Sequence, residues 1–185
     1  LAALRGIPGV IMAAAVDTLP LGMDESSYGT CATLADFQRA INMQSINADG
    51  CVQPAVYAGT SGVLGTLGLH LVAGRDFQDS EYVSSDDKVS AVIVSAALAN
   101  KFFPNGNALG QSIYGGALKP MRIVGIVDPL IRPRLYGFGS NTWTMIYPKK
   151  PSDMSDYYIL RSAPEDRERV LRDASAKLME INPNR

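Results

Sequence analysis

Apolar residues in this chain come in short runs, and the length of those runs limits the structures that the chain can form. The longest, Val10 to Val16, has seven residues, whereas a helix that crosses a bilayer needs about 20. A run of this length, closed by Leu19-Pro20-Leu21-Gly22, is typical of a buried strand. The sequence therefore predicts no membrane span and no signal peptide. Because the chain starts at Leu1 rather than Met, we expect it to be part of a longer protein.

The composition is that of an ordered globular domain. Hydrophobic residues make up 46% of the 185 residues and charged residues 19%, which excludes a disordered tail or a coiled coil. The length suits one domain, or two small subdomains that share a core. With 17 basic and 18 acidic residues the net charge is −1, so charge gives no basis for nucleic-acid binding.

The clearest local pattern lies in the middle of the chain. Val89 to Val94 is typical of a strand, and Ser95 then serves as the N-cap of a helix from Ala96 to Phe103. Pro104 ends that helix. Further strands are expected at Ile113–Gly115, Met121–Val127, Asn141–Tyr147 and Tyr157–Leu160. Strand–helix units interrupted by antiparallel strands indicate an α+β fold.

Both ends of the chain are predicted to be helical. Leu1 to Leu4 reads as the last turn of a helix that Gly6 stops. Near the other end, Ser162-Ala163-Pro164-Glu165 matches a capping box. The apolar residues that follow the capping box have helical spacing; they are Val170, Ala174, Leu178 and Ile181. Leu171 widens this apolar stripe. We therefore expect an amphipathic helix packed on the core.

Residues 23–55 allow two interpretations. Leu34, Phe37 and Ile41 have the spacing of one helix face. Ile41, Met43 and Ser45 could equally alternate along a strand. Both interpretations stay open from the sequence.

The residues that could hold a metal or a cofactor are few. His70 is the one histidine and lies between Leu69 and Leu71, so we interpret it as a satisfied structural residue. A zinc site needs several nitrogen or sulfur ligands at close spacing, and Cys31 and Cys51 are 20 positions apart. The sequence therefore predicts no metal and no cofactor.

Catalytic motifs are absent in the same way. Gly59-Thr60-Ser61-Gly62-Val63 lacks the second glycine of a nucleophile elbow, and no phosphate-binding loop occurs. Gly137-Phe138-Gly139 does not continue into a dinucleotide fingerprint. The acidic pairs Asp24-Glu25 and Asp86-Asp87 read as solvated turns. We assign no catalytic residue and expect a protein that is not an enzyme; a hydrolase using Ser61 or an acidic pair is the weakest alternative.

Several motifs together resemble a known family. They are Ile7–Val10 with Leu19–Gly22, Leu67–Phe77, Val89–Pro104, Ala108–Gly110 and Arg122–Val127. In this order they are similar to the MacB-like periplasmic core domain of ABC transporter permeases of the FtsX type. The resemblance covers most of the chain. It departs from the family at Ser61-Gly62-Val63-Leu64, where an aromatic pair is usual, and it gives no match for residues 23–55.

The family motifs imply structural roles for eight residues. They are Gly68, Gly74, Arg75, Asp76, Phe77, Phe103, Pro104 and Gly110. The two glycines nearest the start, Gly68 and Gly74, permit turns that a side chain would strain. Arg75 and Asp76 are expected to pair locally, and Phe77 to anchor the turn. These positions specify a scaffold and not a catalyst.

The resemblance also implies a location and a role. The chain would be the extracytoplasmic, periplasmic domain of a permease in the cytoplasmic membrane. It would transmit the ATP-driven motion of the membrane helices to a periplasmic adaptor or substrate protein. The implied partners are the membrane helices of the same permease, a cytoplasmic ATPase subunit or domain, and a second copy in a homodimeric transporter. The alternative is a free-standing periplasmic binding or assembly protein of similar fold.

The family fold implies two subdomains. A porter-like α/β unit would come from both chain ends, residues 1–57 and 152–185, and residues 58–151 would form an inserted, mostly β unit. Since both ends would connect to one membrane, we expect Leu1 and Arg185 at the same end of the molecule.

Cys31 and Cys51 are the two cysteines of the chain. The implied compartment is oxidising, where paired thiols tend to be joined. A disulfide closing this loop would stabilise the fold by about 3 kcal/mol in the chain-entropy description. Two separate buried thiols remain the alternative, because free cysteine packs as a small apolar residue.

Overall fold

The computed structural model describes residues 1–45, 49–116, 119–135, 139–151 and 157–182. The α-helices are α1 (Ala2–Arg5), α2 (Leu34–Asn42), α3 (Val63–Leu67), α4 (Ala96–Phe102) and α5 (Arg167–Ile181). The strands are β1 (Val10–Val16), β2 (Ser26–Ser27), β3 (Thr30–Cys31), β4 (Cys51–Val52), β5 (Ala55–Gly59), β6 (Leu71–Gly74), β7 (Ala91–Ser95), β8 (Ser112–Gly115), β9 (Lys119–Val127), β10 (Thr144–Pro148) and β11 (Tyr157–Ser162). Three 3₁₀ turns, η1 (Asp79–Glu81), η2 (Asp86–Lys88) and η3 (Pro164–Asp166), complete the described elements.

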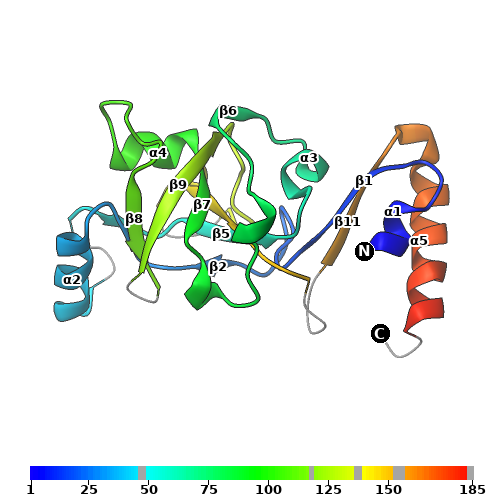
Figure 1. Ribbon diagram of the computed structural model, residues 1–185, viewed down its shortest axis with the longest axis horizontal. Helices are drawn as coiled ribbons and strands as arrows, with labels where there is room; N and C mark the ends of the chain where they lie inside the picture. The colour runs from blue at the N-terminus through cyan, green and yellow to red at the C-terminus, as the bar shows by residue number, and fades with distance from the viewer. Residues whose placement is uncertain (46–48, 117–118, 136–138, 152–156, 183–185) are drawn as a thin grey trace.

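The described strands form one long mixed sheet (Figure 1). Their order is β11-β1-β5-β10-β7-β9-β8-β3-β4, with β2 added to β5 and β6 added to β9. The pairs β5–β10 and β7–β9 are parallel, and the remaining pairs are antiparallel. The sheet and its helices confirm the predicted α+β class.

The core lies on both faces of the central strand β7, whose five residues are all buried. Val92 and Val94 belong to one apolar cluster, together with Leu98 of α4. Ile93 belongs to a second cluster, together with Tyr57 of β5. A strand covered on both faces is apolar throughout, which explains the continuous apolar run in the sequence.

Local hydrogen bonds explain where the central elements begin. The Ser95 hydroxyl accepts the N–H of Leu98 at 3.3 Å, which confirms the predicted cap of α4. β7 begins at Ala91 and not at Val89, because the Val89 N–H closes η2 onto the carbonyl of Asp86. β10 begins later than predicted, at Thr144, because the Trp143 N–H is used in a turn to Ser140.

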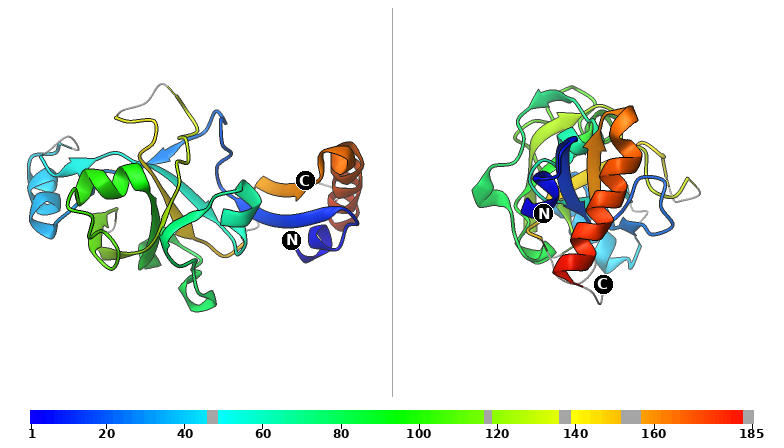
Figure 2. Two further views of the ribbon diagram at one scale, coloured as in Figure 1. Left: turned by 90° about the horizontal axis from the view of Figure 1, so that it is seen from above. Right: turned by 90° about the vertical axis from the view of Figure 1, so that its right-hand side faces the viewer.

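Both chain ends contribute to one end of the molecule. β1 pairs with β11, and α1 and α5 pack beside this pair at the right of Figure 1. The two further views in Figure 2 show the chain start and the end of α5 at the same end. The expectation named Leu1 and Arg185. Leu1 lies at the same end as the last residues of α5, whereas Arg185 lies outside the described residues.

Helix α5 differs from its prediction in two respects. Ser162 is the last residue of β11, paired with Val10, and α5 begins only at Arg167 after η3, without a side-chain cap. The predicted capping box is therefore wrong. Val170 and Ala174 are buried, but Ile181 is 60% exposed. α5 packs on α1 and on residues of β1 and β11 in one small apolar cluster, so a narrow stripe suffices.

The ambiguous segment 23–55 divides between strand and helix. Thr33 caps α2 by accepting the Asp36 N–H at 3.1 Å, so residues 34–42 are helical. Around it, β2 and β5 pair with each other, β5 pairs with β10, and β3 pairs with β8. This segment therefore lies beside strands from the middle of the chain.

Candidate functional site

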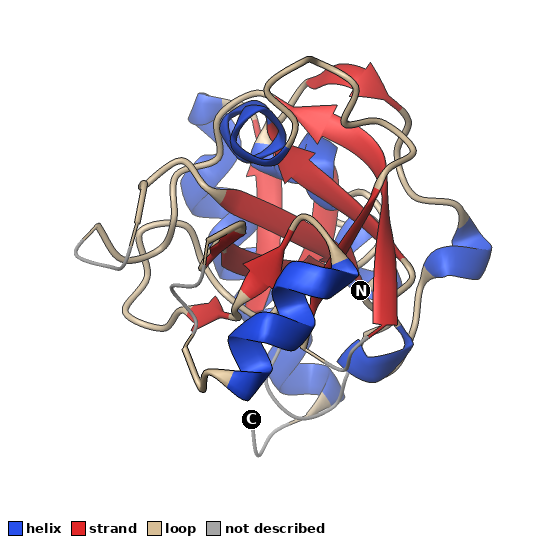
Figure 3. Ribbon diagram, turned by 90° about the vertical axis from the view of Figure 1, so that its left-hand side faces the viewer, coloured by secondary structure: helices blue, strands red, loops and turns tan. Residues whose placement is uncertain are grey.

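The end of the molecule opposite the chain ends carries α2 (Figure 1), and Figure 3 views the molecule from that side. The main contacts of α2 are with β3, β4 and β8. We call residues 30–52 that form β3, α2 and β4 the distal unit. The distal unit lies far from both chain ends.

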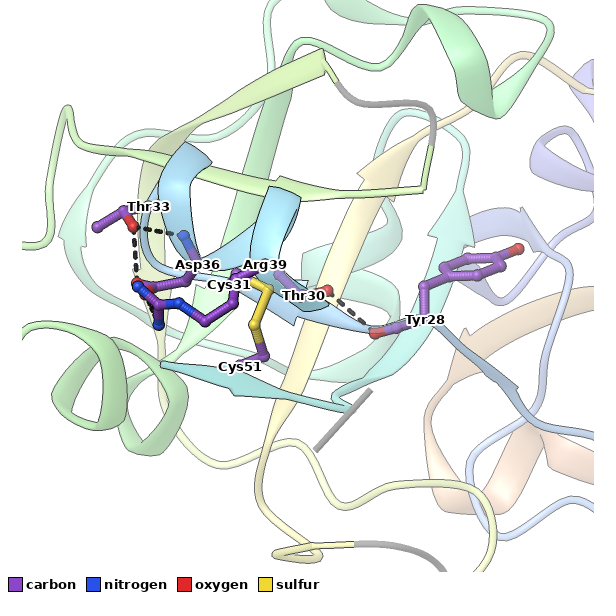
Figure 4. The surroundings of a disulfide bond; sticks show 7 residues. All are labelled: Tyr28, Thr30, Cys31, Thr33, Asp36, Arg39 and Cys51. Atoms are coloured by element: carbon purple, nitrogen blue, oxygen red, sulfur yellow. Dashed lines mark hydrogen bonds and ion pairs between the residues drawn. A yellow bond between two sulfur atoms is a disulfide. The ribbon is translucent and has the colours of Figure 1, made fainter. Parts of the chain in front are cut away.

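Cys31 and Cys51 join the two sides of the distal unit. They stand directly opposite each other on β3 and β4, and their sulfur atoms form a disulfide with an S–S distance of 2.02 Å (Figure 4). Cys31 is 1% exposed, whereas Cys51 is half-buried. The pair packs with Phe37, Ala40 and Tyr114 in a small apolar cluster of its own.

A groove of about 500 Å³ runs beside α2. Its apolar lining includes Tyr28, Phe37, Ile41 and the disulfide. Ile41 is 48% exposed and Met43 63% exposed. The helical interpretation of this segment predicted Phe37 on the buried face, but the sequence contains no signal for a groove.

The Gly74–Phe77 motif forms a turn at the end of β6. The Arg75 N–H donates to the carbonyl of Val124 at 3.0 Å. The Arg75 guanidinium donates two hydrogen bonds to the Glu81 carboxylate at 2.7 and 2.8 Å. These bonds hold the pKa of Glu81 below its usual value.

The local contact expected between Arg75 and Asp76 runs through the main chain of Asp76. Arg75 donates to the main-chain carbonyl of Asp76, and the Asp76 carboxylate accepts the N–H of Phe77 at 2.7 Å. Phe77 is 9% exposed and meets Tyr82 edge-on, with ring centroids 6.0 Å apart.

Some of the other family-motif residues gather near this turn. Arg75 and Gly110 line a polar hollow of about 500 Å³ with Arg122, and the Gly110 N–H donates to the carbonyl of Ile123 at 2.8 Å. Phe103 and Pro104 follow the end of α4. Gly68 ends α3 with a φ of +76°, on the side that faces Arg161 of β11. The motif residues therefore support several connections and do not form one centre.

A buried ion pair escaped the sequence analysis. Arg132, which is 1% exposed, donates to the Glu25 carboxylate at 2.5 and 3.0 Å. Burial alone would raise the pKa of Glu25, but the bonds from Arg132 and from the Arg134 N–H outweigh it and lower the pKa. The prediction that Asp24-Glu25 forms a solvated turn is therefore wrong for Glu25. Its partner lies 107 positions away, so no local pattern could have shown the pair.

His70 is satisfied but not buried. Its side chain is 85% exposed, and its Nδ1 lies 3.1 Å from the Asp128 carboxylate. The Asp128 carboxylate also accepts the His70 N–H at 2.9 Å, and these bonds lower its pKa. The pair ties the start of β6 to the end of β9. The prediction of a structural role agrees with this contact, whereas the apolar neighbours in the sequence misled about exposure.

Two features are absent from the described residues, a metal-binding cluster and a membrane-spanning helix. In the part of the chain that the structure covers, no three His, Cys, Asp or Glu side chains gather as a metal site requires. None of the described helices is long and apolar enough to cross a membrane. Ser61 contributes its main-chain carbonyl to Arg5 at 2.8 Å. The described structure has a groove beside α2 at one end. At the other end it has the paired strands β1 and β11, which are next to the two chain ends.

Comparison with known proteins gives these features a context. The profile of a family described as MacB-like periplasmic core domain matches residues 14–174. The extracellular domain of the noncanonic ABC-type transporter YknZ from Gram-positive bacteria has 16% identity and a TM-score of 0.62, over 100% of this chain and 82% of that chain. The periplasmic region of MacB from Actinobacillus actinomycetemcomitans has 13% identity and a TM-score of 0.63, over 97% and 71%. No curated protein matches the chain in sequence.

Proposed function

Because the chain belongs to the MacB-like periplasmic core domain family, we propose that it transmits motion from membrane helices to a periplasmic protein and is not itself an enzyme. Members of this family are periplasmic domains of ABC transporter permeases, and this chain is such a domain. The proposed driving partner is a cytoplasmic ATPase subunit or domain that moves the helices. The proposed recipient is a periplasmic adaptor or substrate protein.

The observation that supports transmission is the continuity of the sheet. Hydrogen-bonded neighbours run from β11, beside the chain ends, to β4 in the distal unit. A hydrogen-bonded, close-packed sheet has low compressibility and passes a displacement on. Motion applied to α1 and α5 would therefore move the distal groove.

One place in this path is narrow. β1 and β5 share a single ladder pair, Val16 with Gly59. Beside it, the Thr60 hydroxyl accepts the Ala15 N–H at 2.9 Å, and the Asp17 carboxylate accepts the Ala58 N–H at 2.8 Å. We call residues 15–17 and 58–60 the joint, because they connect the chain-end strands to the rest of the sheet.

The joint also bears on the two proposed subdomains. We keep a chain-end unit and an inserted unit, and we now propose a different boundary. Since the strands between residues 26 and 59 pair with β8 and β10, that segment is better placed in the inserted unit. The chain-end unit would then consist of α1, β1, β11 and α5.

The test is a pair of matched substitutions in the complete permease, reconstituted with its ATPase. Thr60→Val removes the hydroxyl of a 4% exposed residue in the joint. Thr66→Val makes the same change at an 8% exposed residue of α3, whose hydroxyl donates to the carbonyl of Gly62, the N-cap of the same helix. We expect Thr60→Val to lower the amount of substrate moved per ATP hydrolysed severalfold, and Thr66→Val to leave it near wild type.

Thermal unfolding of both variants accompanies the transport assay. Similar melting temperatures with different coupling support transmission through the joint. Equal coupling in both variants would contradict it. Fractionation distinguishes the alternative function: a free-standing binding protein would be recovered with the soluble periplasm and not with the membrane.

A further inference from the structure

The side-chain hydrogen bonds at the start of α2 stay within the distal unit. Thr33 caps the Asp36 N–H, and its hydroxyl donates to the Asp36 carboxylate at 2.6 Å. Arg39 pairs with the same carboxylate at 2.9 Å, as Figure 4 shows. These bonds shape α2, but they do not attach it to the sheet.

The apolar attachment of α2 is small. Phe37 and Ala40 are the buried residues of α2, and they rest on the disulfide and on Tyr114. This cluster is separate from the two large clusters around β7. Elsewhere α2 leaves apolar side chains exposed, Leu34 by 41% and Ile41 by 48%. The disulfide is therefore part of the apolar surface on which α2 packs.

The strands that frame α2 are also short. β3 pairs with β4 through two residue pairs, one of which is Cys31 with Cys51. One further main-chain bond, from the Ala32 N–H to the carbonyl of Gly50, continues this pairing. β3 is also paired with β8, again through two residue pairs, so β4 is the edge strand of the sheet and is held by β3 alone. So few ladder bonds hold this edge only marginally.

We propose that the Cys31–Cys51 disulfide is a redox-sensitive clasp. When it is closed, it holds α2 against the sheet and maintains the groove. When it is reduced, α2 leaves the sheet as a local unit, and the sheet around β7 stays folded. Local opening of this kind is expected where buried apolar contacts are few.

The reductant is a dithiol, and the exchange is balanced. Its thiolate attacks the Cys51 sulfur, which is more accessible than the 1% exposed Cys31. A mixed disulfide forms and the Cys31 thiolate leaves. The second thiol of the reductant then attacks the mixed disulfide and releases the Cys51 thiolate. Two electrons pass to the protein, the dithiol becomes a disulfide, and its two protons go to the cysteine thiolates.

The sequence contains a built-in reporter of this opening. Arg39 is the one basic residue between the two cysteines, so trypsin can cut that segment only after Arg39. Lys101, in the 7-residue helix α4, is an internal control, since α4 packs on one of the large clusters. The rates of cleavage at the two positions report on the distal unit and on the core separately.

The experiment is native-state trypsin digestion of the full chain, with and without dithiothreitol. Samples are quenched and separated under reducing conditions, because an intact disulfide would hold the two pieces together. We expect the rate of cleavage after Arg39 to rise at least tenfold on reduction, while the rate after Lys101 changes less than twofold. The double variant Cys31→Ala/Cys51→Ala should show the fast rate at Arg39 without any reductant.

Two results would overturn the clasp. An Arg39 rate that stays within twofold on reduction and in the double variant would show that packing alone holds α2. Parallel acceleration after Arg39 and Lys101 would show that the disulfide stabilises the whole fold and no local unit. Hydrogen exchange of the amides in α2 and in β7 under the same conditions must give the same assignment.

Discussion

At Gly74 the backbone takes a φ of +81°, a region that L-residues enter only with strain. A Cβ at this position would lie 2.3 Å from the carbonyl oxygen of Val124, which belongs to the backbone of β9. Gly106, in the turn after α4, has nearly the same φ of +80° but nothing within 4 Å of its Cβ position. A side chain at Gly106 would therefore meet backbone strain alone, whereas a side chain at Gly74 would meet backbone strain and a steric clash.

Alanine at these two positions should have unequal effects. Gly106→Ala should lower the unfolding free energy by about 1–2 kcal/mol, because alanine must adopt the left-handed conformation. Gly74→Ala adds a clash with a main-chain atom that cannot rotate away, so we expect it to cost clearly more. Urea unfolding of both variants measures the difference. Equal losses would mean that β6 shifts from β9 to make room.

Glu25 and Arg132 form the other decisive residue-scale contact, because both are largely removed from solvent. Breaking a buried pair by removing one partner typically costs about 3–5 kcal/mol, since the remaining charge is left unpaired. The pair joins the loop before β2 to the segment before β10. Its value to the fold is therefore connection between distant parts of the chain.

The pH dependence of this contact has a definite sign. The pKa of Glu25 is lowered in the folded state relative to 4.5, so its contribution is present above that pH and is lost as the pH falls through the folded pKa. The unfolding free energy of wild type should exceed that of Glu25→Gln at pH 7. The gap should close in acid, below pH 4.5. A gap that stays constant would show that the carboxylate charge contributes nothing.

Among the elements, α4 was the easiest to predict and α2 the hardest. The strand β7, the cap Ser95 and the stop at Pro104 are local signals. The cap matches the structure, β7 begins two residues later than predicted, and α4 ends at Phe102, one residue earlier than predicted. α2 exposes three of its five apolar residues. Its packing partners are a cross-strand cysteine pair and Tyr114. Apolar periodicity in a sequence identifies helices that have one continuous buried face. A helix that is held by a few residues distant in the sequence gives only a weak periodic pattern.

Helix α5 shows the same limit at single-residue resolution. Val170 and Leu171 are neighbours in an apolar sequence, and the stripe was predicted to include both. The structure buries Val170 to 2% exposure and leaves Leu171 at 65%. The elements that pack against a helix decide how wide its buried face is. Helix periodicity alone does not show which elements these are.

These neighbours therefore make a matched pair of substitutions. Val170→Ala removes buried methyl groups and should destabilise by about 2 kcal/mol. Leu171→Ala changes an exposed side chain and should stay within about 0.5 kcal/mol of wild type. Denaturant unfolding of the isolated chain provides the comparison. A large loss at Leu171 would indicate that this side is covered by another molecule.

At the scale of the whole molecule, the parts at opposite ends differ in how they are built. The chain ends meet through β1, β11, α1 and α5, whereas the distal unit depends on a disulfide and a small apolar cluster. The common location of the chain ends was expected from the family resemblance, and it required no local pattern. The path of residues 26–59 was not expected, because its strands pair with partners far along the sequence.

The register of β1 with β11 has a mechanical consequence. Val10 pairs with Ser162 at the side of the two chain ends, and Val16 pairs with Tyr157 at the far side. A tension that draws the chain ends apart first has to separate α1 from α5, which pack in one cluster. It then loads the ladder one pair at a time, starting at Val10, so that the strands unzip and do not shear. Unzipping meets the resistance of only one pair at each moment. Under tension the β1–β11 ladder would therefore open from Val10 toward Val16 before the rest of the sheet unfolds.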